Sequence, residues 1–302
     1  MRCLITGASG FIGSALAHHL LAIGWDVSVL LRNPTPIRNP RLNDIWDKLE
    51  FQVADITDAI AMQEKGDFLV FHLAAYNHVG NSWSHVEECA RTNILGTLNA
   101  LQCLKWSRFI YTSSSEVYGH QTRWPWSENM APAPNSPYAV SKYTAELYCQ
   151  VRQRMEERVV ILRPFNAYGP GQATGAIIPE LITKMLKGEE VHVTKGEQTR
   201  EFVYVGDHVE GFVRAAEVLE IPEGPINLCT GKDISIKELV ETLATLTKTK
   251  SKVCFDLPYR NNEIFKMVGD GKKAQKTLGW KPKVGLREGL ERTVEWFKRR
   301  RS

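Results

Sequence analysis

The sequence predicts an α/β fold in which a doubly wound parallel sheet is joined to a smaller α+β lobe. Short apolar strands alternate with helices of about 15 residues in the first half of the chain, a pattern typical of parallel strands linked by crossover helices. A glycine-rich turn connects the first strand to the first helix, and the alternation loosens after residue 164. We therefore expect a large domain at residues 1–165 plus 206–230 and a small lobe at residues 166–205 plus 231–302.

The composition narrows the class of protein. The chain has 302 residues, of which 43% are hydrophobic and 24% charged, enough for a sizeable core. It contains no run of 18 or more apolar residues, so we expect no membrane span, and a net charge of +4 is too slight to indicate nucleic-acid binding. The six cysteines are scattered without a CxxC pair, which favours reduced thiols in a cytoplasmic protein and no metal site.

The first strand, at residues 2–6, is followed by Gly7, Gly10 and Gly13, then by a helix to about Ile23 and a strand at residues 26–31. Glycines let the backbone approach a pyrophosphate, whose charge is favoured at the N-terminus of the following helix. An ordinary glycine-rich turn is the alternative, because the spacing of three and three differs from the commonest fingerprint. The flanking elements favour a dinucleotide-binding loop of Rossmann type.

The end of the second strand bears on the choice of cofactor. A cofactor without a 2′-phosphate usually meets an acidic residue at this point, on its ribose hydroxyls. The chain has Arg32 and Asn33 here and no carboxylate. An arginine can pair with a 2′-phosphate, so the sequence favours NADP over NAD. The alternative is that Arg32 stacks on adenine or points to solvent.

Two further strands lead toward the same ligand. A loose, proline-rich segment at residues 33–44 precedes a strand at residues 50–53, after which Asp55 and Ile56 follow, where a carboxylate could accept from the adenine amine. The strand at residues 68–72 runs into Leu73, Ala74 and Ala75, whose small alanine side chains let the backbone pass close to the cofactor. We interpret His72, at the end of that strand, as a packed residue rather than a catalyst.

A serine-rich turn and a helix carry the candidate chemistry. The strand at residues 108–112 ends in a turn containing Ser114 and Glu116, and Ser136-Pro137 begins a helix on which Tyr138 and Lys142 share a face. Lowering a tyrosine pKa by about three units requires about 4 kcal/mol, which one ammonium at ~4 Å supplies at an effective dielectric constant of ~20. The pair can therefore form a general base for an alcohol proton. A half-buried tyrosine beside a snorkelling lysine is the alternative.

Taken together, these segments resemble the extended short-chain dehydrogenase/reductase family, in its nucleotide-sugar epimerase and dehydratase branch. The resemblance covers nearly all of the chain, and its specificity comes from the order and spacing of the motifs. The matching segments are residues 6–13, 55–56, 73–75, 93, 114, 138–142, 163–171, 200–205 and 278–282.

The resemblance implies a role for each site residue. A nicotinamide cofactor would take a hydride from C4 of a nucleotide sugar, while Tyr138 removes the O4 proton, Lys142 binds the nicotinamide ribose and lowers the tyrosine pKa, and Ser114 hydrogen-bonds O4. Substrate would meet Asn166 at its diphosphate, with Arg200 and Arg260 as cationic clamps. The implied cofactor contacts are Gly7, Ser9, Gly10, Phe11, Ile12, Gly13, Arg32, Asn33, Asp55, Ile56, Leu73, Ala74, Ala75, Tyr138 and Lys142.

The chain departs from the family after Arg260, where members usually have a proline and a glycine and this sequence has Asn261-Asn262-Glu263. The family usually pairs through the helix that bears Tyr138 and the helix near residues 86–104. The resemblance therefore also implies a homodimer.

Glu116 bears on which reaction is catalysed. Simple C4 epimerases need no second base, whereas removing water across C5 and C6 needs a base for the C5 proton. The Ser114-Ser115-Glu116 turn resembles that of the GDP-mannose and legionaminate-pathway 4,6-dehydratases. We rank a 4,6-dehydratase first, a nucleotide-sugar 4-epimerase next and a decarboxylase third. A further alternative is that Glu116 only orders the turn. Another is that the protein senses NADP without turnover, although such proteins tend to lose the tyrosine or the lysine.

Overall fold

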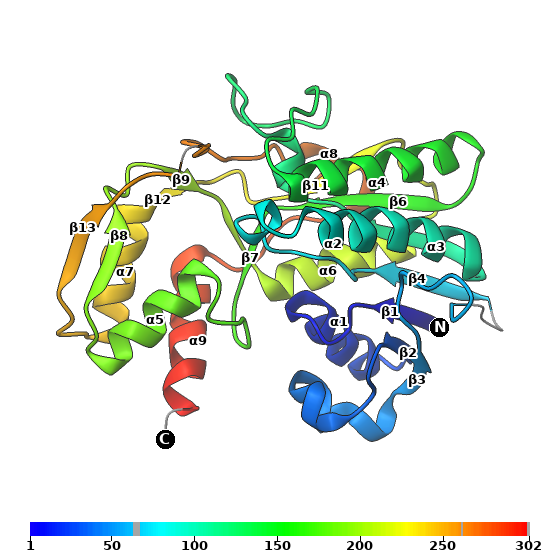
Figure 1. Cartoon of the computed structure of the whole chain (residues 1–302), viewed down its shortest axis with the longest axis horizontal. Coiled ribbons are helices and arrows are strands. Elements are labelled where there is room, and N and C mark those ends of the chain that lie inside the picture. Colours follow the sequence, from blue (N-terminus) through cyan, green and yellow to red (C-terminus); the bar gives the residue numbers. More distant parts are fainter. Residues whose placement is uncertain (63–66, 261, 301–302) are drawn as a thin grey trace.

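A seven-stranded parallel sheet organises the part of the chain that the computed structural model describes, residues 1–62, 67–260 and 262–300 (Figure 1). Its strand order is β11-β6-β5-β4-β1-β2-β3. Starting from β1, the chain adds strands first toward β3 and then, from β4 on, toward β11, so the order of addition reverses between β1 and β4. Doubly wound sheets bind ligands at such a switch point, outside the carboxyl ends of the strands. The strands are β1 (Arg2–Thr6), β2 (Asp26–Leu31), β3 (Glu50–Val53), β4 (Phe68–His72), β5 (Trp106–Thr112), β6 (Val159–Pro164) and β11 (Pro225–Leu228).

Helices bury both faces of the sheet, as parallel sheets require. One apolar core forms between the sheet and α1 (Phe11–Ala22) and α6 (Val205–Glu217), and a second forms under α3 (Gly96–Cys103) and α4 (Pro137–Arg154). The short α2 (Val86–Ala90) packs beside α4, and a π-helical turn, η4 (Arg91–Leu95), joins α2 to α3. The Rossmann-type fold predicted from the sequence is confirmed.

The predicted loose segment after β2 is more ordered than the sequence suggested. Its prolines start two stretches of 3-10 helix, η1 (Pro36–Arg38) and η2 (Pro40–Lys48), and the second packs against α1 through buried Leu42 and Ile45. Two shorter 3-10 turns contact α4: η3 (Asn81–Trp83), which follows β4, and η5 (Ser115–Tyr118), which follows β5.

A smaller lobe has its own core around α5 (Ile177–Lys187), α7 (Ile236–Thr247) and α9 (Leu286–Arg299), seen away from the sheet in Figure 1. Ser235 and Glu238 form a reciprocal capping box that starts α7. Three two-stranded ribbons complete the lobe: β7 (Asn166–Tyr168) with β10 (Phe202–Tyr204), β9 (Thr199–Arg200) with β12 (Ile234–Ser235), and β8 (Val191–Thr194) with β13 (Val253–Leu257).

One helix of the predicted small lobe packs against the large domain instead. In α8 (Lys272–Leu278), Ala274 and Leu278 join the core around α1 and α6, together with Trp280. The Trp280 indole N–H also donates to the Asp207 carbonyl at the start of α6. Burial of these apolar side chains therefore places residues 272–280 against the large domain, before the chain enters the small lobe again at α9. The exact division of the chain into two domains stays a prediction.

No helix in the described part of the chain is both long enough and apolar enough to cross a membrane.

Candidate active site

The glycine turn is packed too tightly for side chains. A Cβ at Gly7 would lie 2.6 Å from the Ala74 nitrogen, and one at Gly13 would lie 2.3 Å from the Gly7 oxygen. Gly7 also has a φ of +75°, which favours glycine. The glycine turn therefore lies against residues 73–74, which follow β4 and belong to the segment predicted to contact the cofactor.

The start of α1 offers donors for an anion. No side chain caps the helix at Gly10, so the backbone N–H groups of its first turn, including those of Phe11 and Ile12, have no capping acceptor. A bare glycine turn followed by uncapped helix N–H groups fits a pyrophosphate. The residues present therefore fit a dinucleotide cofactor.

Buried His72 contacts Thr6, which precedes the glycine turn and also bonds the segment packed against it. His72 Nδ1 lies 2.9 Å from Thr6 Oγ1, and its Nε2 lies 3.1 Å from Thr97 Oγ1. Thr6 Oγ1 in turn accepts from the Ala74 N–H. Burial, with a contribution from the Lys142 charge, lowers the His72 pKa to about 3, so the ring is neutral at pH 7. The interpretation of His72 as a packed residue is confirmed.

Arg32 and Asp55, each predicted separately to contact the cofactor, lie near each other in the structure. Arg32 Nη1 lies 3.9 Å from Asp55 Oδ2, and the Arg32 side chain is 75% exposed. Asp55 Oδ1 accepts from both the backbone N–H and the hydroxyl of Thr57. The nearby Asn33 and Ile56 carbonyls accept from Asn39 and Asn99, which orders the two loops.

Sequence reasoning missed Arg41. From η2, its Nε donates to the Gly171 carbonyl at 3.0 Å and its Nη1 to the Ser9 carbonyl at 3.3 Å. This side chain therefore ties the glycine turn to the first loop of the small lobe. No motif signals it, because the contact joins residues 130 apart in a segment that looked irregular.

The Tyr138 phenol meets Ser114, as predicted. Ser136 caps α4 by accepting from the Ala139 N–H, which fixes the first turn that bears Tyr138. A hydrogen bond from Ser114 acts to lower the Tyr138 pKa, but burial is the larger effect and the Glu116 charge adds to it. The Tyr138 pKa is consequently raised to about 12.

The predicted lowering of the tyrosine pKa by Lys142 is therefore wrong for this structure. Lys142 is buried, and its ammonium lies 4.5 Å from the centre of the Tyr111 ring. Burial lowers the Lys142 pKa to about 8. Desolvation disfavours both the phenolate and the ammonium, and it outweighs the attraction that sequence spacing suggested.

A buried ion pair lies one helical turn beyond Lys142. Arg163 at the end of β6 forms a bidentate pair with Glu146 of α4, with contacts of 2.6 and 3.0 Å. Ser113 donates to the same carboxylate, and the Arg163 guanidinium stacks 4.7 Å from the Tyr118 ring. These contacts hold α4, and with it Tyr138 and Lys142, against the carboxyl ends of β5 and β6.

Asn93 provides a second support. The π-helical turn η4 aims its amide so that Oδ1 accepts from the Tyr76 N–H and Nδ2 donates to the Tyr76 carbonyl and to Ser141. Ser141 lies on α4 between Tyr138 and Lys142. π-bulges are frequent at functional sites, and this one fixes the helix opposite the ion pair.

Glu116 lies within electrostatic reach of both ends of the predicted substrate site. Its backbone N–H donates to Ser114 Oγ at 3.2 Å, and its charge acts on Tyr138. Burial raises the Glu116 pKa, while the charges of Arg200 and Arg260 act in the opposite direction. The Glu116 carboxylate therefore interacts electrostatically with the phenol and with both predicted diphosphate clamps.

Two of the residues predicted to bind the diphosphate already make contacts within the protein. Arg200 forms an ion pair with Glu263 and donates to the Ile264 carbonyl at 2.5 Å. Asn166 Nδ2 donates to the Glu201 carbonyl at 2.9 Å. Arg260 is exposed, and Asn261, which follows it, lies outside the described residues. A diphosphate at Arg200 would therefore compete with Glu263.

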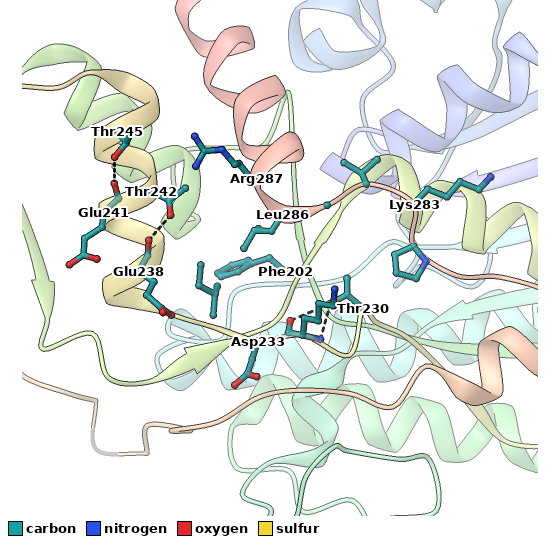
Figure 2. A pocket seen from close by; sticks show the side chains of 15 residues that line it. Phe202, Thr230, Asp233, Glu238, Glu241, Thr242, Thr245, Lys283, Leu286 and Arg287 are labelled. Atoms are coloured by element: carbon teal, nitrogen blue, oxygen red, sulfur yellow. Dashed lines mark hydrogen bonds between the residues drawn. The ribbon is translucent and has the colours of Figure 1, made fainter.

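A cavity of about 890 Å³ lies elsewhere in the small lobe (Figure 2). Its walls come from α7, the start of α9 and the region of Phe202, and no predicted site residue lines it. Acidic Glu238 and Glu241 face it together with basic Lys283 and Arg287. Such mixed charge does not favour a diphosphate, so the predicted substrate site is separate from this cavity.

The fold and site define an extended short-chain dehydrogenase/reductase, and comparisons with known proteins agree. A family model described as GDP-mannose 4,6 dehydratase matches residues 4–293. A putative UDP-glucose 4-epimerase of Methanocaldococcus jannaschii is 35% identical, with 98% of each chain covered. The chain belongs to this family of NAD-dependent nucleotide-sugar epimerases and dehydratases, and it is an enzyme.

Solved structures show the same similarity. A UDP-glucose 4-epimerase of Thermotoga maritima with UDP-glucose has a TM-score of 0.91 at 31% identity, covering all of both chains. A UDP-glucuronic acid 4-epimerase of Bacillus cereus, in complex with UDP-glucuronic acid and NAD, has a TM-score of 0.88 at 31% identity, covering 99% of each. The family prediction is confirmed, whereas the preference for NADP gains no support from these neighbours.

Proposed function

We propose that this enzyme is a nucleotide-sugar 4,6-dehydratase. The observation that carries the proposal is that the Glu116 carboxylate, next to Ser114 on the turn after β5, interacts electrostatically with both Tyr138 and the pair Arg200 and Arg260. A nucleotide sugar with its diphosphate at the arginines and O4 at the phenol would present its C5 and C6 atoms between them. A carboxylate whose pKa is raised by burial suits proton transfer near neutral pH.

The residues divide the work as follows. Tyr138 takes the proton from O4, and Ser114 holds that oxygen by a hydrogen bond. A nicotinamide dinucleotide, when bound, would supply the hydride acceptor for C4 and later the hydride donor for C6. Oxidation at C4 would make the C5 proton acidic, so Glu116 would remove it and deliver a proton to the departing O6 hydroxyl, which leaves as water. The hydride would then add to C6 of the resulting C5–C6 double bond, while a proton from solvent adds to C5. Lys142 binds the cofactor ribose, and Arg200 holds the diphosphate after exchanging Glu263 for it.

A 4-epimerase is the second candidate, and a decarboxylase the third. The epimerases among the similar proteins favour the former. An epimerase would use the same Tyr138, Ser114 and Lys142 but would have no task for Glu116, whose carboxylate would then only order the turn after β5. Glu116 is therefore the residue that separates the two reactions.

The test is incubation of the full-length enzyme with UDP-glucose, dTDP-glucose and GDP-mannose in D2O, followed by mass spectrometry and NMR. We expect loss of water and one deuterium at C5 with one of these substrates.

Tyr138→Phe should lower turnover by about 100-fold or more while cofactor binding persists. Glu116→Gln should abolish dehydration, whereas Glu241→Gln, an exposed carboxylate on α7, should leave the rate unchanged. A mass-neutral C4 mixture that survives Glu116→Gln would mark an epimerase.

We further propose that the enzyme prefers NADP, because Arg32 is exposed beyond β2 and no carboxylate occupies the end of that strand. A charged hydrogen bond to a 2′-phosphate contributes about 1.5–3 kcal/mol, or roughly 10- to 100-fold in Kd. Calorimetry should therefore show tighter NADP binding that Arg32→Ala abolishes and the neighbouring exposed Arg38→Ala does not. Tighter binding of NAD, unaffected by Arg32→Ala, would contradict this preference.

A homodimer through α4 is the proposed assembly. The exposed face of α4 carries apolar side chains at helical spacing (Val140, Leu147, Tyr148, Val151 and Met155), and Val86 of α2 and Leu95 of η4 are exposed nearby in the chain. Figure 1 shows α2 and α4 side by side. Pairing two copies would bury this face.

Light scattering should give a dimer for the natural chain and a monomer for the double variant Leu147→Glu, Val151→Glu, since two buried carboxylates per protomer oppose pairing. The control is Leu219→Glu, which changes an apolar side chain exposed at the end of α6. A monomeric natural chain, or a double variant that stays dimeric, would refute the proposed interface.

A further inference from the structure

The outer face of the β8–β13 ribbon gathers side chains that bind metals. Side chains alternate along a strand, so Val191 and Val193 enter the core of the small lobe while Glu190 and His192 face solvent. The parallel register sets Cys254 directly beside His192. A carboxylate, an imidazole and a thiol therefore meet on one surface, although they come from segments about 60 residues apart.

Their spacing matches a coordination sphere. One potential ligand atom from each of Glu190, His192 and Cys254 lies within 4.8 Å of the others. Cys254 Sγ is 3.1 Å from Glu190 Oε1, and His192 Nε2 is 3.8 Å from Glu190 Oε2. In tetrahedral zinc sites, bonds of 2.0–2.3 Å place neighbouring ligand atoms about 3.3–3.7 Å apart. The first separation is slightly shorter than this range and the second slightly longer, and they involve different oxygens of Glu190, so side-chain rotation would have to draw the three ligand atoms together around the metal.

Asp256 orients the imidazole for this role. The register of the ribbon shifts between Phe255 and Leu257, and this irregularity lets Asp256 reach His192 Nδ1 at 2.9 Å. A carboxylate on Nδ1 holds the proton there and leaves Nε2 free as a lone-pair donor. Carboxylate–histidine pairs of this kind support histidine ligands in zinc proteins.

We propose that Glu190, His192 and Cys254 form a zinc site on the small lobe, with Asp256 as the supporting carboxylate. One oxygen, one nitrogen and one sulfur ligand suit Zn²⁺, which accepts all three, and leave a fourth position for water. The metal would cross-link β8 to β13, which the fold otherwise joins only as a two-stranded ribbon. None of the residues proposed for catalysis takes part.

Lys252 is the group that competes with the metal. Its ammonium lies 2.7 Å from Glu190 Oε1, but its side chain is 76% exposed. Exposed pairs of this kind contribute little, so the lysine can leave. Removing it should strengthen metal binding, an effect that a mere hydrogen-bonded surface cluster would not produce.

The test is titration of the full-length, chelator-treated protein with ZnCl₂ by calorimetry, with CoCl₂ absorption as a probe of thiolate coordination. We expect one site per chain and a thermal midpoint that rises with added zinc. His192→Ala and Cys254→Ser should each weaken binding at least about tenfold, and Asp256→Asn by about 10- to 100-fold. Lys252→Ala should tighten binding.

Two control variants address other surface groups. His18→Ala changes another histidine paired with a carboxylate, the half-buried partner of Asp44, and Cys103→Ser changes another free thiol. Both should bind zinc like the natural chain. The proposal is overturned if no saturable site appears, if binding is unchanged in both Cys254→Ser and His192→Ala, or if the cobalt complex lacks a thiolate band. Circular dichroism of each variant separates a lost site from a lost fold.

Discussion

The candidate active site depends on the burial of a phenol and an ammonium that lie one helical turn apart on α4. Burial raises the Tyr138 pKa to about 12 and lowers the Lys142 pKa to about 8. Each shift of two or more units corresponds to about 3 kcal/mol against the charged form. The resting site therefore favours a neutral phenol, and proton removal from a substrate requires additional positive charge nearby. An oxidised nicotinamide ring carries such a charge, which links the acid–base step to cofactor binding.

The rest of the large domain holds this pair in place. The bidentate Glu146–Arg163 pair fastens α4 to β6, and Asn93 fastens the same helix from the other side through Ser141. Removing one partner of a buried ion pair typically costs about 3–5 kcal/mol, because the other charge is left uncompensated. The glycine turn is held by packing that leaves no room for a side chain at Gly7 or Gly13, and His72 adds a hydrogen bond to Thr6.

Much of the fold and of the cofactor loop could be predicted, because these features follow from local sequence patterns. The glycine turn, the strands at residues 26–31 and 50–53, and the start of α4 at Ser136-Pro137 follow from periodicity, capping and turn chemistry. What failed depends on three-dimensional burial. The direction of the Tyr138 pKa shift cannot be obtained from an i, i+4 spacing, which records a neighbouring charge but not desolvation. The contacts of Arg41 and Glu263, and the packing of α8 on the large domain, join residues distant in sequence. The expectation of no metal site rests on cysteine spacing and stays a prediction, which the proposed zinc site would overturn.

The most direct test is a spectroscopic titration of Tyr138, taken as the ultraviolet difference between the natural chain and Tyr138→Phe across pH. The account predicts a phenol pKa well above 10 without cofactor. It also predicts a fall of at least about one unit when oxidised cofactor is bound, and a smaller fall with the reduced form, whose ring is neutral. A Tyr138 pKa that is near neutral without cofactor, or that does not respond to the oxidised form, would contradict it.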